Sequence, residues 1–446
     1  MKVLLISPNR EQVPDPAFPL GLAYIASALM RHGHNVRVLD LCFADDAEAA
    51  IASAIAGFRP EVIGMSLRNI DDVAYPKQHS YLRGYRETVA AVRRHTTAPL
   101  VLGGSGFTIM PEQFMDALGA DFGITGEGER AFPRLLKDIS SGKKTAEGCI
   151  ITSRPRITEL DEITPDRGLF DTSSYYDLGG MLNIQTKRGC PFRCIYCTYP
   201  KVEGRKVRMR DPVDVADELE GVVEKTGARH FFIVDSIFNF PAAHAAAVCS
   251  EIISRKLDIQ WSCYANPAYM SEELAEVMVR AGCTGVEFGT DSLEDTVLKK
   301  LGKNFTWKKV VKASDVCRRS GLRHCHFVFA GAPGDTDGTV RITIERLEEL
   351  RPDAAVVMAG IRIFPGTVLA DVARQDLGIA GPGLEPVFYL SPDVRSYDDI
   401  TEEVSQKRSW IMPGFEINIH PRLQRKLREH GIRGPLWEEL ARRKSK

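Results

Sequence analysis

The stretch that decides the fold is "NIQTKRGCPFRCIYCTYPKVEGRKVRMRDP", residues 183–212. It holds Cys190, Cys194 and Cys197 in the spacing C-x3-C-x2-C, directly after a short β-rich run. A structural zinc site is closed by a fourth Cys or His close by, but neither follows here before His230. Three thiolates with an open fourth position are typical of a [4Fe–4S] cluster whose fourth iron is free to bind a small molecule. A zinc knuckle with a distant fourth ligand is the weaker alternative.

Strand-like and helix-like segments alternate from this loop onward. Six apolar runs, from "LNIQTKRG" to "AAVVMAGIRIFPGT", are separated by helix-like segments. Such alternation predicts parallel strands covered by helices, and six units predict a partial (β/α)6 barrel over residues 181–380. Barrels carry their chemistry at the C-terminal ends of the strands, which is where the cysteine loop lies. Residues 381–446 are expected to form a small helical extension that caps the barrel mouth.

A second alternating region precedes the loop. Residues 1–150 contain five strand-like runs separated by helical segments, beginning with "KVLLISP" at residues 2–8. This pattern predicts an α/β domain with a doubly wound, Rossmann-like parallel sheet. Residues 151–180 contain interspersed polar residues and prolines, and they are predicted to form a linker. Ligands of such sheets bind beyond the C-terminal strand ends. The loops expected there span residues 7–19, 66–76, 103–107 and 126–129.

Length and composition set the broad class of the protein. The chain has 446 residues, of which 44% are hydrophobic and 26% charged, and its net charge is −1. This length predicts two or three domains, and the balanced charge gives no long-range attraction for nucleic acid or an anionic membrane. No apolar run reaches the length of a membrane span, and the N-terminal "MKVLLISPNR" becomes polar too soon for a signal peptide. Seven of the ten cysteines are scattered singly outside the loop, so a reduced, cytoplasmic protein is predicted.

The cysteine loop resembles that of the radical S-adenosylmethionine (SAM) enzymes, because an aromatic residue, Tyr196, precedes the last cysteine. The resemblance implies that the open iron binds SAM, and that reductive cleavage of SAM yields a 5′-deoxyadenosyl radical. Similar strand-end segments, such as "FIVDSIF" and "VEFGTDS", imply further SAM contacts. The residues so implied are Tyr196, Asp235, Ser236, Asp291, Ser292 and Gly331. The Gly-Gly-Glu motif that many members carry at the second strand is absent.

The N-terminal region resembles the cobalamin-binding domain of one large radical SAM class, through "GMSLRN" and "LGGSG". The implied cobalamin contacts are Ser66, Leu67, Arg68, Gly103, Gly104, Gly126 and Glu127. The Asp-x-His-x-x-Gly motif, which supplies a histidine ligand to cobalt in cobalamin mutases, is absent. We therefore expect cobalamin bound without a protein nitrogen ligand. Arg68 is expected either near the lower face of cobalt or in an ion pair with Asp71 or Asp72.

Several polar residues have two interpretations. His324 and His326 share one face of a predicted strand, and they either face the barrel lumen as catalytic candidates or lie satisfied in the core. The lumen-facing interpretation places Cys325 and its aromatic neighbours, which lie on the other strand face, against the helices. The basic run at residues 201–210 is interpreted mainly as a solvated loop, with guidance of an anionic substrate or a reductant as the alternative. The "GEGE" turn at 126–129 is either a helix start or a ligand contact.

Together, the resemblances imply a cobalamin-dependent radical SAM enzyme. The commonest chemistry of that class is methyl transfer to an unactivated carbon, here of a small-molecule, natural-product or lipid precursor. The implied cofactors are a [4Fe–4S] cluster, SAM and cobalamin, and the implied protein partner is a flavodoxin- or ferredoxin-type reductant. A rearrangement or ring-forming enzyme without methyl transfer is the first alternative. A non-catalytic iron–sulfur carrier or sensor is the second, although a carrier needs no six-unit barrel.

Overall fold

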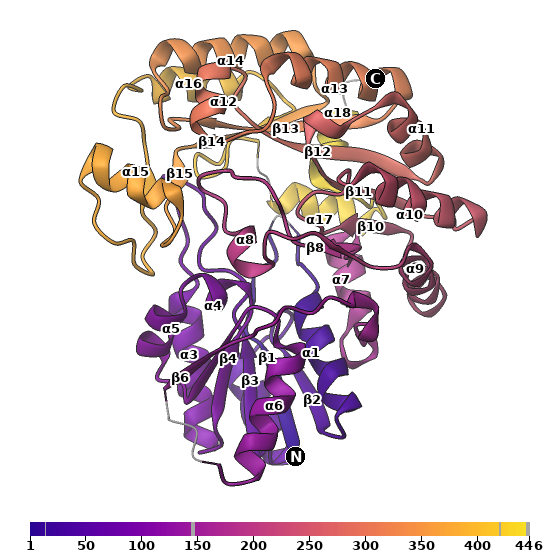
Figure 1. Cartoon of the computed structure of the whole chain (residues 1–446), viewed down its shortest axis with the longest axis vertical. Coiled ribbons are helices and arrows are strands. Elements are labelled where there is room, and N and C mark those ends of the chain that lie inside the picture. Colours follow the sequence, from indigo (N-terminus) through magenta and orange to yellow (C-terminus); the bar gives the residue numbers. More distant parts are fainter. Residues whose placement is uncertain (14, 144–147, 419–420, 443–446) are drawn as a thin grey trace.

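The computed structural model describes residues 1–13, 15–143, 148–418 and 421–442. The chain forms two α/β units that are stacked end to end (Figure 1). The N-terminal unit points the C-terminal ends of its strands toward the larger unit, and the short helix α8 (Tyr199–Val202) lies between them. No helix of the described chain combines the length and apolar character of a bilayer span.

The N-terminal unit contains a six-stranded parallel sheet in the order β2-β1-β3-β4-β5-β6. Its strands are β1 (Lys2–Ser7), β2 (Asn35–Asp40), β3 (Val62–Ser66), β4 (Leu100–Gly103), β5 (Phe122–Thr125) and β6 (Cys149–Thr152). Strand order reverses between β1 and β3, and ligands of doubly wound sheets bind at such a point. The predicted fold is confirmed, and β6 carries the sheet two residues past the predicted boundary at 150.

Helices cover both faces of this sheet because its strands are apolar on both sides. They are α1 (Leu20–Arg31), α2 (Ala47–Phe58), α3 (Leu82–His95), α4 (Ser105–Ile109), α5 (Pro111–Leu118) and α6 (Gly128–Ser140). Val3 and Leu5 of β1 pack in one core with α1 and α6, whereas Leu4 and Ile6 pack in the other core with α2 and α3. This alternation follows from the two-residue period of a strand.

The C-terminal unit is built on a seven-stranded parallel sheet in the order β17-β14-β13-β12-β11-β10-β7. Its strands are β7 (Leu182–Ile184), β10 (His230–Ile233), β11 (Gln260–Ala265), β12 (Cys283–Asp291), β13 (Arg323–Ala330), β14 (Ala354–Ala359) and β17 (Trp410–Ile411). The six predicted barrel strands are confirmed. The seventh, β17, comes from the tail, which was predicted to be irregular and then helical, and it extends the sheet beyond β14.

The barrel helices form an outer layer around this sheet. They are α9 (Pro212–Thr226), α10 (Ala242–Ser254), α11 (Glu272–Arg280), α12 (Asp295–Lys300), α13 (Trp307–Ser320) and α14 (Asp337–Leu350). The start of α9 is encoded by "DP": Asp211 caps the helix by accepting a hydrogen bond from Val213 N, and Pro212 occupies the first helical position. The helix α7 (Thr172–Gly179) precedes the barrel in the predicted linker.

The tail reaches both ends of the barrel. Near the cysteine loop, α15 (Val368–Leu377) is held by a hydrogen bond from Leu369 N to Ile195 O, and β15 (Ile361–Arg362) pairs with β16 (Phe388–Tyr389). At the opposite end, Trp437 of α18 (Leu436–Arg442) packs with Cys325 inside the barrel. The tail was expected to cap one mouth; its last described helix instead closes the end remote from the cysteines. The helices α16 (Tyr397–Ser405) and α17 (Pro421–Glu429) complete it, and residues 419–420 and 443–446 of the predicted extension lie outside the described residues.

Candidate active site: a cysteine loop and an interdomain cavity

The cysteine loop leaves the barrel at the C-terminal end of β7 and is fixed at several backbone positions. The base of the loop is closed by two antiparallel strands of two residues each, β8 (Lys187–Arg188) and β9 (Arg208–Met209). Cys190 N donates to Gly204 O at 3.0 Å, and Ile195 N donates to Leu301 O at 3.1 Å. The loop is therefore positioned by barrel backbone on two sides before any ligand binds.

The three thiols of the loop lie near enough to one another to interact electrostatically. Cys190 is buried, and Cys194 and Cys197 are half-buried. Burial, together with the nearby Cys194 and Cys190, raises the pKa of Cys197 to about 12. Thiols in such surroundings become thiolates when a metal takes the place of the proton. Among the described residues, no three or more His, Cys, Asp or Glu side chains, the loop thiols included, are arranged as a site for one metal ion.

A buried polar triad lies beside the thiols. The Tyr196 hydroxyl donates to Asp291 Oδ2 at 2.6 Å, and Lys303 Nζ lies 2.8 Å from the same oxygen. The side chains of Lys303 and Asp291 are only 7% and 4% exposed, so this ion pair is shielded from water. Its charges reach the cysteines: the Lys303 ammonium lowers the pKa of Cys194, although burial still raises that pKa overall.

Asp235 supports the loop from below. It is fully buried, and its carboxylate accepts hydrogen bonds from Thr186 N, Thr186 Oγ1 and Lys187 N. These contacts hold the chain between β7 and the cysteines, so a supporting role fits this geometry better than the predicted contact with SAM. Ser236 donates from Oγ to Gly189 O at 3.3 Å and also hydrogen-bonds the Cys190 side chain, which places it next to the first thiol.

Ser292 and Gly331, two further predicted SAM contacts, are both buried. Ser292 Oγ lies 3.2 Å from Thr343 Oγ1 of α14, so it points toward the helix layer and not toward the cysteines. Gly331 has a φ of +95°, and a Cβ at this position would lie 2.1 Å from Tyr397 Oη. Tyr397 therefore covers this glycine, and the absence of a side chain is needed for that close approach.

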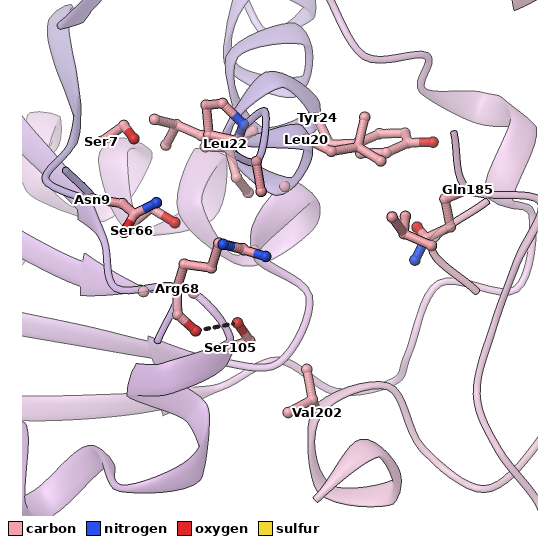
Figure 2. Close-up of a pocket in the computed structure, with 18 of the residues that line it drawn as sticks. Ser7, Asn9, Leu20, Leu22, Tyr24, Ser66, Arg68, Ser105, Gln185 and Val202 are labelled. Atoms are coloured by element: carbon pink, nitrogen blue, oxygen red, sulfur yellow. Dashed lines mark hydrogen bonds between the residues drawn. The ribbon is translucent and has the colours of Figure 1, made fainter. Parts of the chain in front are cut away.

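A cavity of about 610 Å³ lies between the two units. Its walls combine the C-terminal strand ends of the first sheet, the start of α1, the cysteine-loop helix α8 and the near end of the barrel lumen. Figure 2 shows Ser7, Asn9, Ser66 and Arg68 on one side of it, and Gln185 and Val202 on the other. The packing of α8 on α4 holds the two units together here, with Lys201 Nζ donating to Ile109 O at 2.8 Å.

The sequence-predicted glycine loops meet at this cavity. Leu67 N donates to Gly103 O, and Gly106 N donates to Leu67 O. A Cβ on Gly104 would lie 2.6 Å from Leu67 O, so only glycine permits this approach. The predicted residues that line the cavity are Ser66, Arg68, Gly103, Gly104, Gly126 and Glu127. Leu67 is the exception: its side chain is fully buried in the core.

Arg68 extends into the cavity. Figure 2 shows its guanidinium directed into the open space, while its backbone oxygen accepts a hydrogen bond from Ser105 Oγ. The predicted alternative, an ion pair with Asp71 or Asp72, is wrong: Asp71 is paired with Arg362 at 2.8 Å, and Asp72 Oδ1 accepts hydrogen bonds from the loop backbone.

The "GEGE" turn begins α6 and places Glu129 in its first turn, as the helix-start interpretation predicted, and it also has a role that neither interpretation included. Glu127 and Glu129 are buried and form ion pairs with Arg208 and Arg188 of the β8–β9 hairpin, at 2.5 Å and 2.7 Å. These pairs join the two units beside the cavity. The prediction that the basic run at 201–210 is a solvated loop is therefore wrong for Arg208, and also for Arg210, which is buried against Glu218 at 2.5 Å.

Comparison with known proteins agrees with this two-part site. Residues 7–136 match the profile of the B12 binding domain, and residues 184–347 match that of the radical SAM superfamily. The chain is a radical SAM protein with a B12-binding domain. It is 26% identical to tryptophan 2-C-methyltransferase of Streptomyces laurentii, over 84% of this chain and 75% of that protein. It is 25% identical to the anaerobic magnesium-protoporphyrin IX monomethyl ester cyclase of Rubrivivax gelatinosus, over 80% of this chain and 67% of the cyclase.

Solved structures match over the full length of the radical SAM protein. The radical SAM methyltransferase TsrM of Kitasatospora setae, with cobalamin and a [4Fe–4S] cluster bound, superposes with a TM-score of 0.85 at 25% identity. The superposition covers 100% of this chain and 98% of TsrM. The two units and their relative placement are therefore shared with TsrM.

The two histidines of the radical SAM protein do not face its lumen, so their prediction as catalytic candidates is wrong. His326 accepts or donates hydrogen bonds at both ring nitrogens, to Thr290 Oγ1 at 2.6 Å and Ser314 Oγ at 3.0 Å, and Ser314 lies on α13. Burial lowers the pKa of His324 to about 4 and that of His326 well below its usual value. Both are neutral core residues, as in the alternative interpretation, but only His326 is satisfied: His324 has no hydrogen bond at either ring nitrogen within the described residues, although its Nδ1 lies 3.4 Å from Asp353 Oδ2. Cys325, on the other strand face, points inward toward Trp437.

Two functional-site residues were missed at the sequence level. Lys303 lies in the loop after α12, where "LGKN" carries no motif, and only the fold brings it to Asp291. Glu287 lies on β12 at an even spacing from Gly289, on the strand face from which Asp291 Oδ1 is also reached. That spacing was available as a signal, because a glutamate within an otherwise apolar strand must face an interior site or solvent.

Proposed function

We propose that this radical SAM protein is a cobalamin-dependent methyltransferase that acts on an unactivated carbon of a small molecule. The observation that carries the proposal is the meeting of the two cofactor regions at one cavity. Residues that follow the cysteine loop (Thr198, Tyr199) and glycines of the B12-binding sheet (Gly103, Gly104) line the same 610 Å³ space. A carrier or sensor needs no such junction.

The residues present fit the implied cofactors. Cys190, Cys194 and Cys197 would hold a [4Fe–4S] cluster with one iron open, and Gly103 and Gly104 leave room for a corrin ring at the strand ends. Together these groups supply, when bound with SAM, an electron, a carbon radical and a transferable methyl group. The chain itself contributes position, because residues of both units line the cavity.

The Tyr196–Asp291–Lys303 triad is proposed to orient SAM beside the cluster. Lys303 and Asp291 compensate each other's charge, and both lie within 4.0 Å of the position that a Cβ on Gly289 would occupy. A zwitterionic ligand can exchange hydrogen bonds with such a pair without leaving a buried charge alone. Ser236, next to Cys190, is proposed as a further contact.

Arg68 is proposed to lie against cobalamin without binding cobalt. A guanidinium stays protonated and has no lone pair to offer a metal, and no histidine occurs in the loop at residues 7–19. Bound cobalamin is therefore expected to lack a protein nitrogen ligand. Electron paramagnetic resonance of the cobalt(II) form tests this: nitrogen superhyperfine splitting from an axial imidazole would contradict the proposal.

A flavodoxin- or ferredoxin-type reductant is the proposed protein partner, because cleavage of SAM consumes an electron that the chain does not generate. The exposed basic residues Arg193, Arg205 and Lys206 surround the cysteine loop and suit an acidic protein of this kind. The proposed compartment is the cytoplasm, since all ten cysteines are unpaired in the structure, as expected in a reducing environment.

Product analysis separates the possible functions. Anaerobically reconstituted protein is incubated with SAM, cobalamin, a strong reductant and candidate small molecules, and products are followed by mass spectrometry. S-adenosylhomocysteine together with 5′-deoxyadenosine and a product heavier by one methylene supports the methyltransferase. 5′-Deoxyadenosine without S-adenosylhomocysteine supports ring closure or rearrangement, an outcome consistent with the similarity to the cyclase. An intact cluster that leaves SAM uncleaved would identify a carrier and reject the proposal.

A further inference from the structure

The lumen of the barrel contains a carboxyl group that the proposed cofactor sites do not use. Along β12, Gly285, Glu287 and Gly289 point to the same face. Asp291 follows a register shift and has a φ of +67°, but its carboxylate lies on this side too, because its Oδ1 is 4.0 Å from the position of a Cβ on Gly289. The residues between them, such as Val286 and Phe288, pack in the helix-side core. Glu287 therefore lies inside the barrel. It precedes Gly289 by two residues and Asp291, which is paired with Lys303, by four.

Glu287 is enclosed and has no counter-charge in the described part of the chain. It is 6% exposed, and its Oε1 accepts a hydrogen bond of 2.8 Å from Trp437 Nε1. Its other oxygen, Oε2, has no hydrogen-bond partner among the described residues, and no cation there lies within ion-pair distance. The charged neighbours are already matched: Glu438 pairs with Arg323 at 3.1 Å, and Asp15 pairs with Arg428 at 2.8 Å.

The wall beside Glu287 is aromatic and opens to the interdomain cavity. Tyr264 is the register partner of Glu287 on β11, and it remains 39% exposed. It packs edge-on against Phe232 of β10 at 4.9 Å between ring centroids, and both rings line the cavity. Between Glu287 and Asp291, Gly289 is exposed, and a Cβ built on it would meet only Lys303 Nζ and Asp291 Oδ1, at 3.9 Å and 4.0 Å, so no side chain of this strand separates the two carboxyls.

Such a site favours a cationic ligand. Burial raises the pKa of Glu287 to about 7, with the Trp437 hydrogen bond lowering it and the negative charges of Glu438 and Asp15 raising it. A carboxylate removed from water is unfavourable until it is paired. An ammonium group at Oε2 would supply that pairing, and the neighbouring rings would accept the apolar part of the same molecule.

We propose that Glu287 recognises a protonated amine on the methyl acceptor, while Phe232 and Tyr264 hold an adjacent apolar or aromatic group. The inference rests on the proposed function in one respect, that the acceptor enters through this cavity. It adds the substrate class: a small molecule with a basic nitrogen next to an apolar body. Trp437 of α18 is the positioning residue, because its Nε1–H fixes one carboxylate oxygen.

A matched pair of probes tests this binding without any turnover. Binding of 2-phenylethylamine and of 2-phenylethanol to the anaerobically reconstituted holoenzyme is measured at pH 8 by calorimetry. The two probes differ in the ammonium group. The ammonium probe is expected to bind at least tenfold more tightly, and Glu287→Gln is expected to abolish that preference. Glu276→Gln, an exposed change on α11, should leave it intact.

The pH dependence provides a measurement that needs no variant. The groups facing Glu287 are Tyr264 on β11, Cys325 on β13, Glu438 on α18 and the Asp15 loop. Burial raises the pKa values of Tyr264 and Cys325, so both stay neutral, and the two carboxylates are ion-paired. Preference for the ammonium probe should therefore fall as pH falls through about 7, because Glu287 then takes up a proton.

Two results would overturn the inference: equal binding of both probes by the wild-type protein, or an ammonium preference that survives Glu287→Gln. Binding is read separately from methyl transfer, so the two proposals can fail independently. Selective ammonium binding without any methylated product would reject the proposed function alone. Methylation by a protein with no ammonium preference would reject the substrate class alone.

Discussion

Two carboxyl groups on one face of β12 divide the barrel into an upper and a lower region. Asp291, at the cysteine end, accepts a hydrogen bond from Tyr196 and forms an ion pair with Lys303. Glu287, four residues earlier, receives a single hydrogen bond from Trp437 and has no cation among the described residues. Both are buried, so solvent does not explain the difference.

The difference shows what each region is prepared for. The upper region is electrostatically complete, which suits a ligand that arrives with both charges, as SAM does. The lower region holds an uncompensated carboxyl beside aromatic rings, which suits a ligand that brings a cation. Each experiment below changes one side of this contrast.

The largest effect is expected at the cysteines above Asp291. Replacing Cys190, Cys194 and Cys197 by Ala should abolish the iron–sulfur absorption and all SAM cleavage, because three thiolates are needed to hold the cluster. Binding of 2-phenylethylamine at Glu287 should persist, since its pairing does not involve the loop. Stoichiometric zinc without iron–sulfur absorption in the wild-type protein would contradict the cluster assignment.

Breaking the upper ion pair should be the next largest effect. Asp291→Asn leaves the Lys303 ammonium buried without a partner, which costs about 3–5 kcal/mol of unfolding free energy. Asparagine tolerates the left-handed backbone at this position, where φ is +67°, so the loss reports the charge. Unfolding of the apoprotein by urea measures it.

A double variant and a surface control sharpen this result. Lys303→Met combined with Asp291→Asn should recover most of the lost stability, because neither charge is then left alone. Asp315→Asn removes a comparable but exposed pair with Arg318, whose side chains are 43% and 50% exposed, and should change stability by about 0.5 kcal/mol or less. Equal losses of unfolding free energy for Asp291→Asn and Asp315→Asn would contradict the claim that the Asp291–Lys303 pair is shielded from water.

Sequence patterns predicted the scaffold well because the scaffold is encoded locally. Strand–helix alternation, the spacing of Cys190, Cys194 and Cys197, and the Asp211 cap each depend on residues close in the chain. What alternation cannot decide is which face of a strand points inward. The inward role proposed for His326 failed for this reason: outside β13, Ser314 of α13 hydrogen-bonds its ring, whereas the lumen takes the opposite strand face.

The electrostatic partners were beyond the reach of sequence patterns. Arg208 is paired with Glu127, some eighty residues away along the chain, and Trp437 reaches Glu287 across 150 residues. Such pairs form only when the two sheets and the tail are assembled, so a basic run or a lone glutamate looks solvent-exposed in the sequence. The lower region of the barrel was therefore hidden even though its strand was predicted.

Removing the lower charge should stabilise the protein. The pKa of Glu287 rises from 4.5 to about 7 on folding, so the folded state resists ionisation and wild-type stability falls as pH rises through this interval. The Glu287→Gln variant has no carboxyl to ionise, so at pH 8 it should be more stable than the wild-type protein by about 3 kcal/mol. Near pH 4 the two proteins should be similar. Urea unfolding at both pH values checks the sign, and a less stable variant at pH 8 would contradict it.

The smallest effect is expected from Trp437→Phe, which keeps an aromatic ring against Gly285 but removes the Nε1–H that binds Glu287. The lost hydrogen bond should cost about 1 kcal/mol at pH 5, where the carboxyl is neutral. The same hydrogen bond lowers the pKa of Glu287, so its loss should move the midpoint for 2-phenylethylamine binding to higher pH. Trp307→Phe, on the partly exposed start of α13, serves as the matched control and should leave the midpoint unchanged. If the midpoint stays the same in Trp437→Phe, then α18 closes the barrel without tuning the carboxyl, and the contrast between the two regions depends on burial alone.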